Sequence, residues 1–210
     1  MNNLLYSSSR CKSGDLLLAR RSVDATPSRG EHQQQNASLV YSLLNALTNK
    51  EYSQQIKMQL EGFHGIWRRM EEVATTEKGA KIFSDYGHVV SSLEVGLKAL
   101  KEKFPEKKLI CIFQPHQIHR ILQGRNEFPE ALKGYDERYI YNIYAARENF
   151  QKIVGTHQLG EIFAEHCESR YLKTFDEVEN IIEKAGTNAI IMVYSAGDID
   201  YALRKYLKVI

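Results

Sequence analysis

Two histidines and an arginine lie within five positions of the segment "IFQPHQIHRI", directly behind the apolar run "KLICIF". His116 and His119 have a spacing at which two imidazoles can share a metal ion, but the segment offers no acidic or thiolate ligand beside them. We therefore expect no metal here, and we expect both histidines to face solvent or a substrate. Arg120 could pair with a carboxylate or with charge developing on a phosphate.

Two other polar segments follow predicted strands. "NIYAARE" (142–148) runs off the end of "RYIY", and "SAGD" (195–198) follows "IIMVY". Ligands of parallel sheets bind outside the carboxyl ends of the strands, so the three segments should meet at one edge. Gly197 and Asp198 also fit an ordinary strand-to-helix turn, in which the carboxylate faces the first backbone N–H groups of the helix.

Three further polar groups have ordinary structural readings when taken singly. His32 and Asn36 could begin a helix. Arg68, Arg69 and Glu71 alternate on a presumed strand. Asp85, Tyr86 and His88 lie at the end of a strand.

The elements that must position these residues alternate between strands and helices after residue 106. Such alternation predicts a Rossmann-like α/β fold, a mostly parallel sheet with helices on both faces. The expected strands are 108–113, 138–144, 170–174 and 189–197. The expected helical regions lie around 128–132 and 159–163 and over 175–185 and 198–207.

The first half of the chain predicts helices, a hairpin and one more helix. Apolar residues recur at helical spacing from 36 to 47, and a second helix should end at Gly62. The segments 67–73 and 80–87, joined by "ATTEKG", predict a β-hairpin, and a helix should follow from 90 to 104. Residues 1–30 are poorly specified, with only 15–23 resembling a strand.

Composition narrows the possible partners. The 210 residues are enough for one domain with an appendage, and 26% charged residues nearly cancel to +2. This balance favours neither nucleic acid nor an acidic membrane surface as a partner. The three cysteines are far apart and form no C-x-x-C pair, which is typical of reduced thiols in a cytoplasmic protein. The sequence contains no run of about 18 apolar residues, which is the pattern that predicts a membrane span.

The sequence contains neither G-x-x-x-x-G-K-[ST] nor G-x-G-x-x-G. These motifs cradle phosphates on backbone N–H groups at the start of a helix. Any phosphate cradle must therefore come from residues outside this sequence.

Six segments, taken in order, resemble motifs of the Mur ligases, ATP-dependent enzymes that add amino acids in peptidoglycan synthesis. The resemblance is strongest to members that add L-alanine to UDP-N-acetylmuramate, and it covers about residues 28–210. The segments are "GEHQQQNA" (30–37), "FHGIWRRME" (63–71), "DYGH" (85–88), "FQPHQIHR" (113–120), "NIYAARE" (142–148) and "SAGDI" (195–199).

This resemblance implies a domain organisation. Residues 1–84 would be the end of the central ATP-binding domain without its P-loop, and 85–210 would be the C-terminal domain. It also implies ATP and Mg²⁺ as cofactors, with the magnesium ligands on the other part of the central domain. A separate chain could carry that part, together with the domain that binds the UDP-sugar.

The resemblance also implies residue roles. His32 and Asn36 would lie at the adenine, and Arg69 and Asp85 at the ribose and phosphates. The amino acid and the acyl phosphate would face five residues, of which His88, His116 and Arg120 would be catalytic. The five are Tyr86, His88, His116, Gln117 and Arg120.

Some positions depart from the family pattern. Gln117 stands where arginine is common, and Asn142 where aspartate is usual. Because the positive charge usual at this position is missing from residue 117, the chain could instead belong to a ligase that adds another amino acid. The alternative from a different functional class is a non-catalytic binding module that has the Mur ligase fold but not its chemistry.

Overall fold

The computed structural model describes residues 31–63, 65–148 and 156–209. The chain divides into two compact units, Met1–His64 and Gly65–Ile210, and each is described by itself. The strand expected over 15–23 lies outside the described residues.

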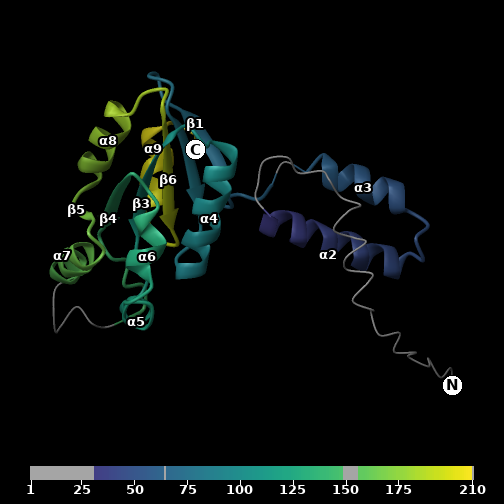
Figure 1. Ribbon diagram of the computed structural model, residues 1–210, viewed down its shortest axis with the longest axis horizontal. Helices are drawn as coiled ribbons and strands as arrows, with labels where there is room; N and C mark the ends of the chain where they lie inside the picture. The colour runs from purple at the N-terminus through teal and green to yellow at the C-terminus, as the bar shows by residue number, and fades with distance from the viewer. Residues whose placement is uncertain (1–30, 64, 149–155, 210) are drawn as a thin grey trace. The chain divides into compact units, whose positions relative to one another are not determined.

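The described residues of the first unit form two helices, α2 (Glu31–Leu47) and α3 (Ser53–Glu61), as the periodicity predicted (Figure 1). Helix α2 begins before Asn36, so this residue lies inside the helix rather than at its entry. The Ser53 hydroxyl joins the two helices by donating a hydrogen bond to the Asn45 side-chain oxygen.

The second unit is built on a six-stranded sheet. Its order is β1-β2-β6-β3-β4-β5, with β1 antiparallel to β2 and the other neighbours parallel. The mostly parallel sheet is therefore confirmed. The strands are β1 (Glu71–Thr75), β2 (Lys81–Asp85), β3 (Lys108–Gln114), β4 (Glu137–Tyr141), β5 (Arg170–Leu172) and β6 (Ala189–Ser195).

Helices cover both faces of this sheet (Figure 1). Along β3, Cys111 and Phe113 face one hydrophobic core, while Ile110 and Ile112 face the other. Helices α4, α5, α6 and α7 supply the first core, and α8 and α9 supply the second. The helices are α4 (Val90–Lys103), α5 (Ile118–Gln123), α6 (Phe128–Lys133), α7 (Thr156–His166), α8 (Phe175–Lys184) and α9 (Ile199–Tyr206).

The predicted hairpin joins the same sheet, since β2 pairs with β6 over its whole length. The compact unit therefore begins at Gly65, earlier than the domain boundary expected at residue 85. Strand β1 also starts later than the expected 67–73, because Arg68 and Met70 have φ angles of 56° and 48°, far from the extended values of a regular strand.

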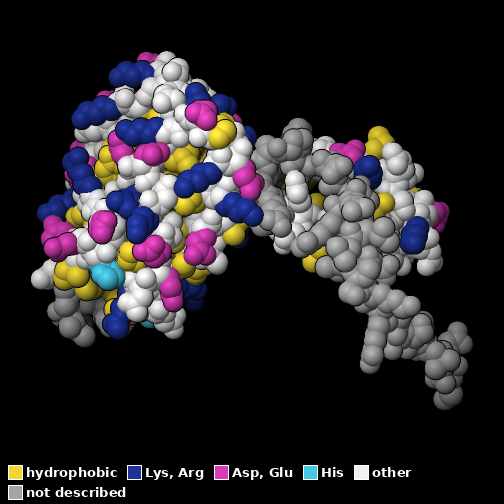
Figure 2. All heavy atoms as spheres, viewed as in Figure 1, with side chains coloured by type: hydrophobic (Ala, Val, Ile, Leu, Met, Phe, Trp, Pro, Cys, Tyr) yellow, Lys and Arg dark blue, Asp and Glu magenta, His cyan; other side chains and the backbone are white. Residues whose placement is uncertain are grey.

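Strand β4 ends at Tyr141, short of the expected 144. The chain leaves the sheet there, and Tyr144 instead forms a bridge with His116. On the face shown in Figure 2, basic and acidic side chains are interspersed, as the small net charge suggests. No helix among the described residues is long and apolar enough to cross a membrane.

Candidate functional site

The site lies at the carboxyl ends of β3 and β6, where the strand order reverses direction. Gln114 ends β3 and connects the loops that follow. Its side-chain oxygen accepts hydrogen bonds from Ser195 Oγ (2.7 Å) and Ile199 N (3.2 Å). Its side-chain nitrogen donates to Asp198 Oδ1 (2.7 Å) and the Asn142 carbonyl (3.3 Å). The three polar segments therefore meet at one edge, as predicted.

Gly197 is required by this close approach. A Cβ there would lie 2.5 Å from Gln114 Oε1 and 2.7 Å from Tyr144 Cγ, far inside van der Waals contact. Asp198 precedes α9, but its side chain makes no cap hydrogen bond to the helix and pairs with Gln114 instead. The turn thus anchors the polar loops to one another.

The loop 115–117 is held by Tyr144. Tyr144 donates its backbone N–H to the Pro115 carbonyl and accepts one from Gln117, both at 2.9 Å. Its ring stacks on His116, with centroids 5.7 Å apart. Gln117 has a φ of 66°, in the region that favours glycine, so the backbone is strained at this residue.

Glu148, the last residue of "NIYAARE", fixes the start of α5. Its carboxylate accepts hydrogen bonds from the backbone N–H groups of Ile118 and His119 and from the His119 ring. Burial raises the pKa of Glu148, but the hydrogen bonds from His119 and from the two backbone groups outweigh burial and lower it overall. An ionised carboxylate therefore anchors the helix that carries Arg120.

Four of the expected site residues come together around Arg120: Tyr86, His88, His116 and Arg120 itself. We call them the Arg120 cluster. The Arg120 guanidinium donates a hydrogen bond to His88 Nε2. The His88 ring lies 5.2 Å from the His116 ring and 5.5 Å from the Tyr86 ring, between centroids. Arg120 thus points toward His88.

Both cluster histidines are poorer bases than usual. Burial lowers the pKa of His88, with Arg120 and Arg69 adding to the effect, while a hydrogen bond to the Tyr86 carbonyl opposes it. Burial also lowers the pKa of His116, followed by the charges of His88 and Arg120. Both imidazoles are therefore neutral at pH 7, and a neutral His88 can accept the Arg120 hydrogen bond while donating from Nδ1 to Tyr86.

Three buried side-chain atoms among the described residues have no hydrogen-bond partner: Arg68 Nε, His116 Nδ1 and Gln117 Oε1. Two of them belong to the loop after β3. Unpaired buried polar atoms are costly, so their concentration here marks a place where a ligand would supply partners.

A cleft of about 730 Å³ opens beside the Arg120 cluster, between the start of α4 and the segment formed by α5 and α6. Arg120 and His88 line it on one side. Glu94 and Glu127 also line it, so the cleft offers both charge signs. Its volume falls within the usual range for small-molecule sites.

The expected nucleotide-binding residues are less gathered. Asp85 is 8% exposed, and its oxygens accept the backbone N–H groups of Met70 (2.8 Å) and Gly87 (2.6 Å). Arg69 is exposed, with its guanidinium carbon 5.7 Å from the Tyr86 ring centroid. His32 and Asn36 lie on α2, in the other compact unit.

A network of buried and half-buried charges next to this edge was not anticipated from the sequence. Arg204 donates two hydrogen bonds to Glu71 (2.7 and 3.2 Å) and one to Asp200 (3.0 Å). Arg68 lies 3.4 Å from Asp200 and donates to the Ser195 carbonyl. A signal was available: Asp200 and Arg204 are four residues apart beside the inward-facing Ile199 and Leu203, so they share the buried face of α9.

The described residues form no group of three or more histidine, cysteine, aspartate or glutamate side chains that could hold a metal ion. The magnesium implied by the family resemblance therefore has no ligand set in the part of the chain that is described. No chemical step below depends on it.

A mostly parallel sheet with a polar cluster beyond its strand ends is typical of α/β domains that bind ligands at that edge. The family described as "Mur ligase, glutamate ligase domain" matches residues 68–197, more than half of the chain. The chain therefore belongs to the Mur ligase family.

Two curated relatives carry the name UDP-N-acetylmuramate--L-alanine ligase. The chain is 31% identical over 172 residues to UDP-N-acetylmuramate--L-alanine ligase of Clostridium acetobutylicum, covering 81% of this chain and 37% of that protein. It is 28% identical over 204 residues to the same-named enzyme of Clostridium botulinum strain Okra, covering 94% and 43%. The chain thus spans about two fifths of the length of these relatives.

Solved structures share the fold. UDP-N-acetylmuramate-alanine ligase from Thermotoga maritima is 24% identical with a TM-score of 0.67, covering 86% of this chain and 38% of that one. Mycobacterium tuberculosis folylpolyglutamate synthase, solved with ADP and AMPPCP, is 12% identical with a TM-score of 0.62, covering 86% and 41%.

Proposed function

We propose that this chain forms part of an ATP-dependent ligase that joins L-alanine to UDP-N-acetylmuramate. The observation that carries the proposal is the Arg120 cluster, in which a guanidinium and two imidazoles lie at the switch point of a Mur ligase sheet. The names of the two curated relatives describe this reaction. A cytoplasmic location, expected from the cysteines, accompanies the proposal.

The cluster suits the chemistry of such a ligase. Phosphoryl transfer from ATP activates the sugar-linked carboxylate as an acyl phosphate. The amine of alanine then attacks the carbonyl carbon, and the tetrahedral intermediate expels phosphate as the amide forms. Arg120 would stabilise negative charge on the phosphate and the intermediate. His116, neutral and with Nδ1 unpaired, could accept the proton that the amine loses.

The remaining roles follow the same proposal. The unpaired Gln117 Oε1 is an acceptor that could orient the N–H bonds of the amine. Arg69 and Asp85 would approach the ribose and phosphates, and His32 and Asn36 the adenine. The segment that carries the phosphate cradle, in the same or a separate chain, would complete the enzyme.

One observation favours a substrate amino acid other than alanine. The cleft beside Arg120 measures about 730 Å³, far more than an alanine methyl group needs, and Glu94 and Glu127 line it. A larger or cationic amino acid would fit these walls. Gln117 in place of the family's usual arginine also changes the charge of the pocket.

A chimeric enzyme tests the proposal. The C-terminal segment of the C. acetobutylicum ligase is replaced by residues 31–210, and phosphate release is measured with ATP, Mg²⁺, UDP-N-acetylmuramate and a panel of amino acids. We expect L-alanine to give the highest kcat/KM. Faster turnover with another amino acid selects the alternative substrate. No turnover, from a chimera that folds and binds UDP-N-acetylmuramate, indicates a non-catalytic module.

The 210-residue chain alone provides the matching control. Given the same substrates, it should release no phosphate above background, because its sequence has no P-loop. Turnover by the purified chain alone would contradict the proposed division of labour.

A further inference from the structure

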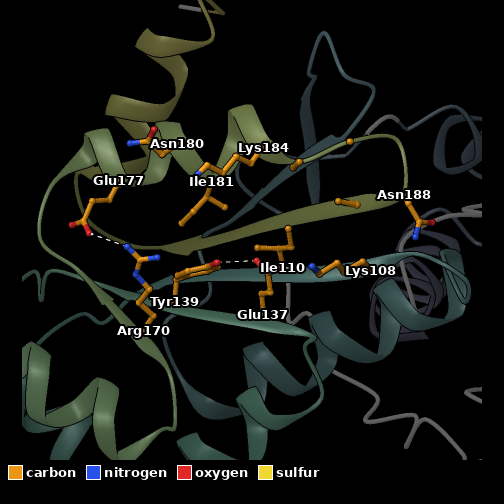
Figure 3. Close-up of a pocket in the computed structure, with 13 residues that line it drawn as sticks. Lys108, Ile110, Glu137, Tyr139, Arg170, Glu177, Asn180, Ile181, Lys184 and Asn188 are labelled. Atoms are coloured by element: carbon orange, nitrogen blue, oxygen red, sulfur yellow. Dashed lines mark hydrogen bonds and ion pairs between the residues drawn. The ribbon is translucent and has the colours of Figure 1, made fainter.

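We propose that a second pocket, at the amino ends of the strands, binds a small organic anion consisting of a carboxylate on a planar apolar body. The pocket has a volume of about 480 Å³ and lies between α8 and the first residues of β3, β4 and β5 (Figure 3). It is separated from the Arg120 cluster by the length of β3, about 20 Å. The proposal is independent of the ligase function.

The floor of the pocket is apolar. Ile110 is 4% exposed and belongs to the core under α8, and Ile181 and Tyr139 pack against that core while remaining partly exposed. Figure 3 shows Ile181 pointing from α8 toward the strand that carries Ile110. In the sheet register Ile110 lies beside Glu137, and Tyr139 lies beside Arg170. The pocket thus presents an apolar surface bordered by charged residues.

The two carboxylates of the lining are already occupied. Glu137 accepts hydrogen bonds from Lys108 and from the Tyr139 hydroxyl (2.8 Å). Glu177 accepts the backbone N–H groups of Lys173 (2.7 Å) and Thr174 as part of the capping box of α8, and it also faces Arg170 (3.6 Å). These acidic groups therefore have little capacity left for a cationic ligand.

The basic groups have donors to spare. Lys184 makes no hydrogen bond or ion pair with any described residue, although it lines the pocket. Lys108 and Arg170 each face one carboxylate, which leaves further N–H groups on both. The lining counts three basic and two acidic side chains, a net charge of +1. Excess donors above an apolar floor suit a carboxylate attached to a flat hydrocarbon body.

The size of the pocket argues against a bare inorganic anion as its natural occupant. A phosphate ion would meet Lys184 but would leave the surfaces of Ile181 and Tyr139 in water. An aromatic carboxylate would satisfy both parts at once, since its ring would cover the apolar floor while the charged group met the lysines.

The experiment is an NMR titration of the full chain with isotope-labelled isoleucine methyl groups. The probes are benzoate, benzamide and inorganic phosphate. Benzoate carries both a ring and a charge. Benzamide carries the ring without the charge, and inorganic phosphate carries charge without a ring. We expect benzoate to shift the Ile110 and Ile181 methyl signals saturably at concentrations up to about 10 mM, and to bind at least about fivefold more tightly than either other probe.

A pair of variants locates the charge. Lys184→Gln should weaken benzoate binding about tenfold, because it removes a charge-assisted hydrogen bond. Lys205→Gln, an exposed change on α9 outside the pocket lining, should leave benzoate binding unchanged. The proposal is overturned if benzoate leaves Ile110 and Ile181 unmoved, if benzamide or phosphate binds as tightly, or if the two variants bind benzoate alike.

Discussion

Two glutamines, three residues apart, show how differently the end of β3 and the loop beyond it are built. Gln114 is 2% exposed, and its amide has four hydrogen-bond partners from two separate segments. Gln117 has a φ of 66° and a buried side-chain oxygen without a partner. The strand end is therefore built for stability, while the loop keeps a strained backbone and unpaired atoms to which a ligand or water could bind.

The largest expected effect is on catalysis, and it distinguishes the loop beyond β3 from the end of the strand. In the chimeric ligase, Arg120→Ala should lower kcat by about a hundredfold to a thousandfold, because it removes a donor to charge that develops in the transition state. The unfolding midpoint in urea should change little. Steady-state phosphate release and urea denaturation measure the two quantities.

Arg125→Ala is the matched control for this change. Arg125 is an exposed residue in the turn between α5 and α6, and its backbone carbonyl accepts a hydrogen bond from His166. This variant should retain turnover. If Arg120→Ala and Arg125→Ala turn over alike, the catalytic role of Arg120 is wrong.

Gln114→Leu should show the opposite pattern, a loss of stability. The change leaves Ser195, Asp198 and the Ile199 N–H without their buried partner, at a cost of about 3 kcal/mol in the free energy of unfolding. Urea denaturation of the chain measures it. Gln123→Leu, at an exposed position of α5, should change stability by less than about 0.5 kcal/mol. Equal effects of the two changes would refute the anchoring role.

Gln117→Gly should stabilise the chain by about 1 kcal/mol, because glycine adopts a positive φ without strain and the gain exceeds its larger unfolded-state entropy. The same substitution should raise the KM of the chimera for the amino acid, since the acceptor Oε1 is lost. A gain in stability with an unchanged KM would show that the strain serves no binding role.

The smallest effect concerns the titration of His88. Its pKa lies below the ordinary 6.5 through burial and then through Arg120. The folded chain thus binds fewer protons than the unfolded chain, so this contribution to stability is present above pH 6.5 and is lost as pH falls through the folded pKa. In NMR titrations, Arg120→Ala should raise the His88 pKa, and Arg125→Ala should not. A lower or unchanged His88 pKa in Arg120→Ala would contradict the contact.

Much of this arrangement could be predicted from residue patterns. The alternation of apolar strands with amphipathic helices predicted the parallel sheet, and the polar residues after β3, β4 and β6 predicted the edge at which they meet. The positive φ angles of Arg68 and Gln117 could not be foreseen, because tertiary contacts impose them against local preference. Glu148 was noticed only as part of a motif, since its partners at Ile118 and His119 lie about 30 residues away.

The charge network of the half-buried Arg68 and Glu71 with the buried Asp200 and Arg204 has a consequence for sequence variation. Two positive and two negative side chains cancel only as a set, and losing one leaves a buried charge uncompensated. Drift at one of these four positions would therefore require a matching change at another. Homologues should keep all four residues or exchange them in pairs, so that the history of substitutions would record this contact even without a structure.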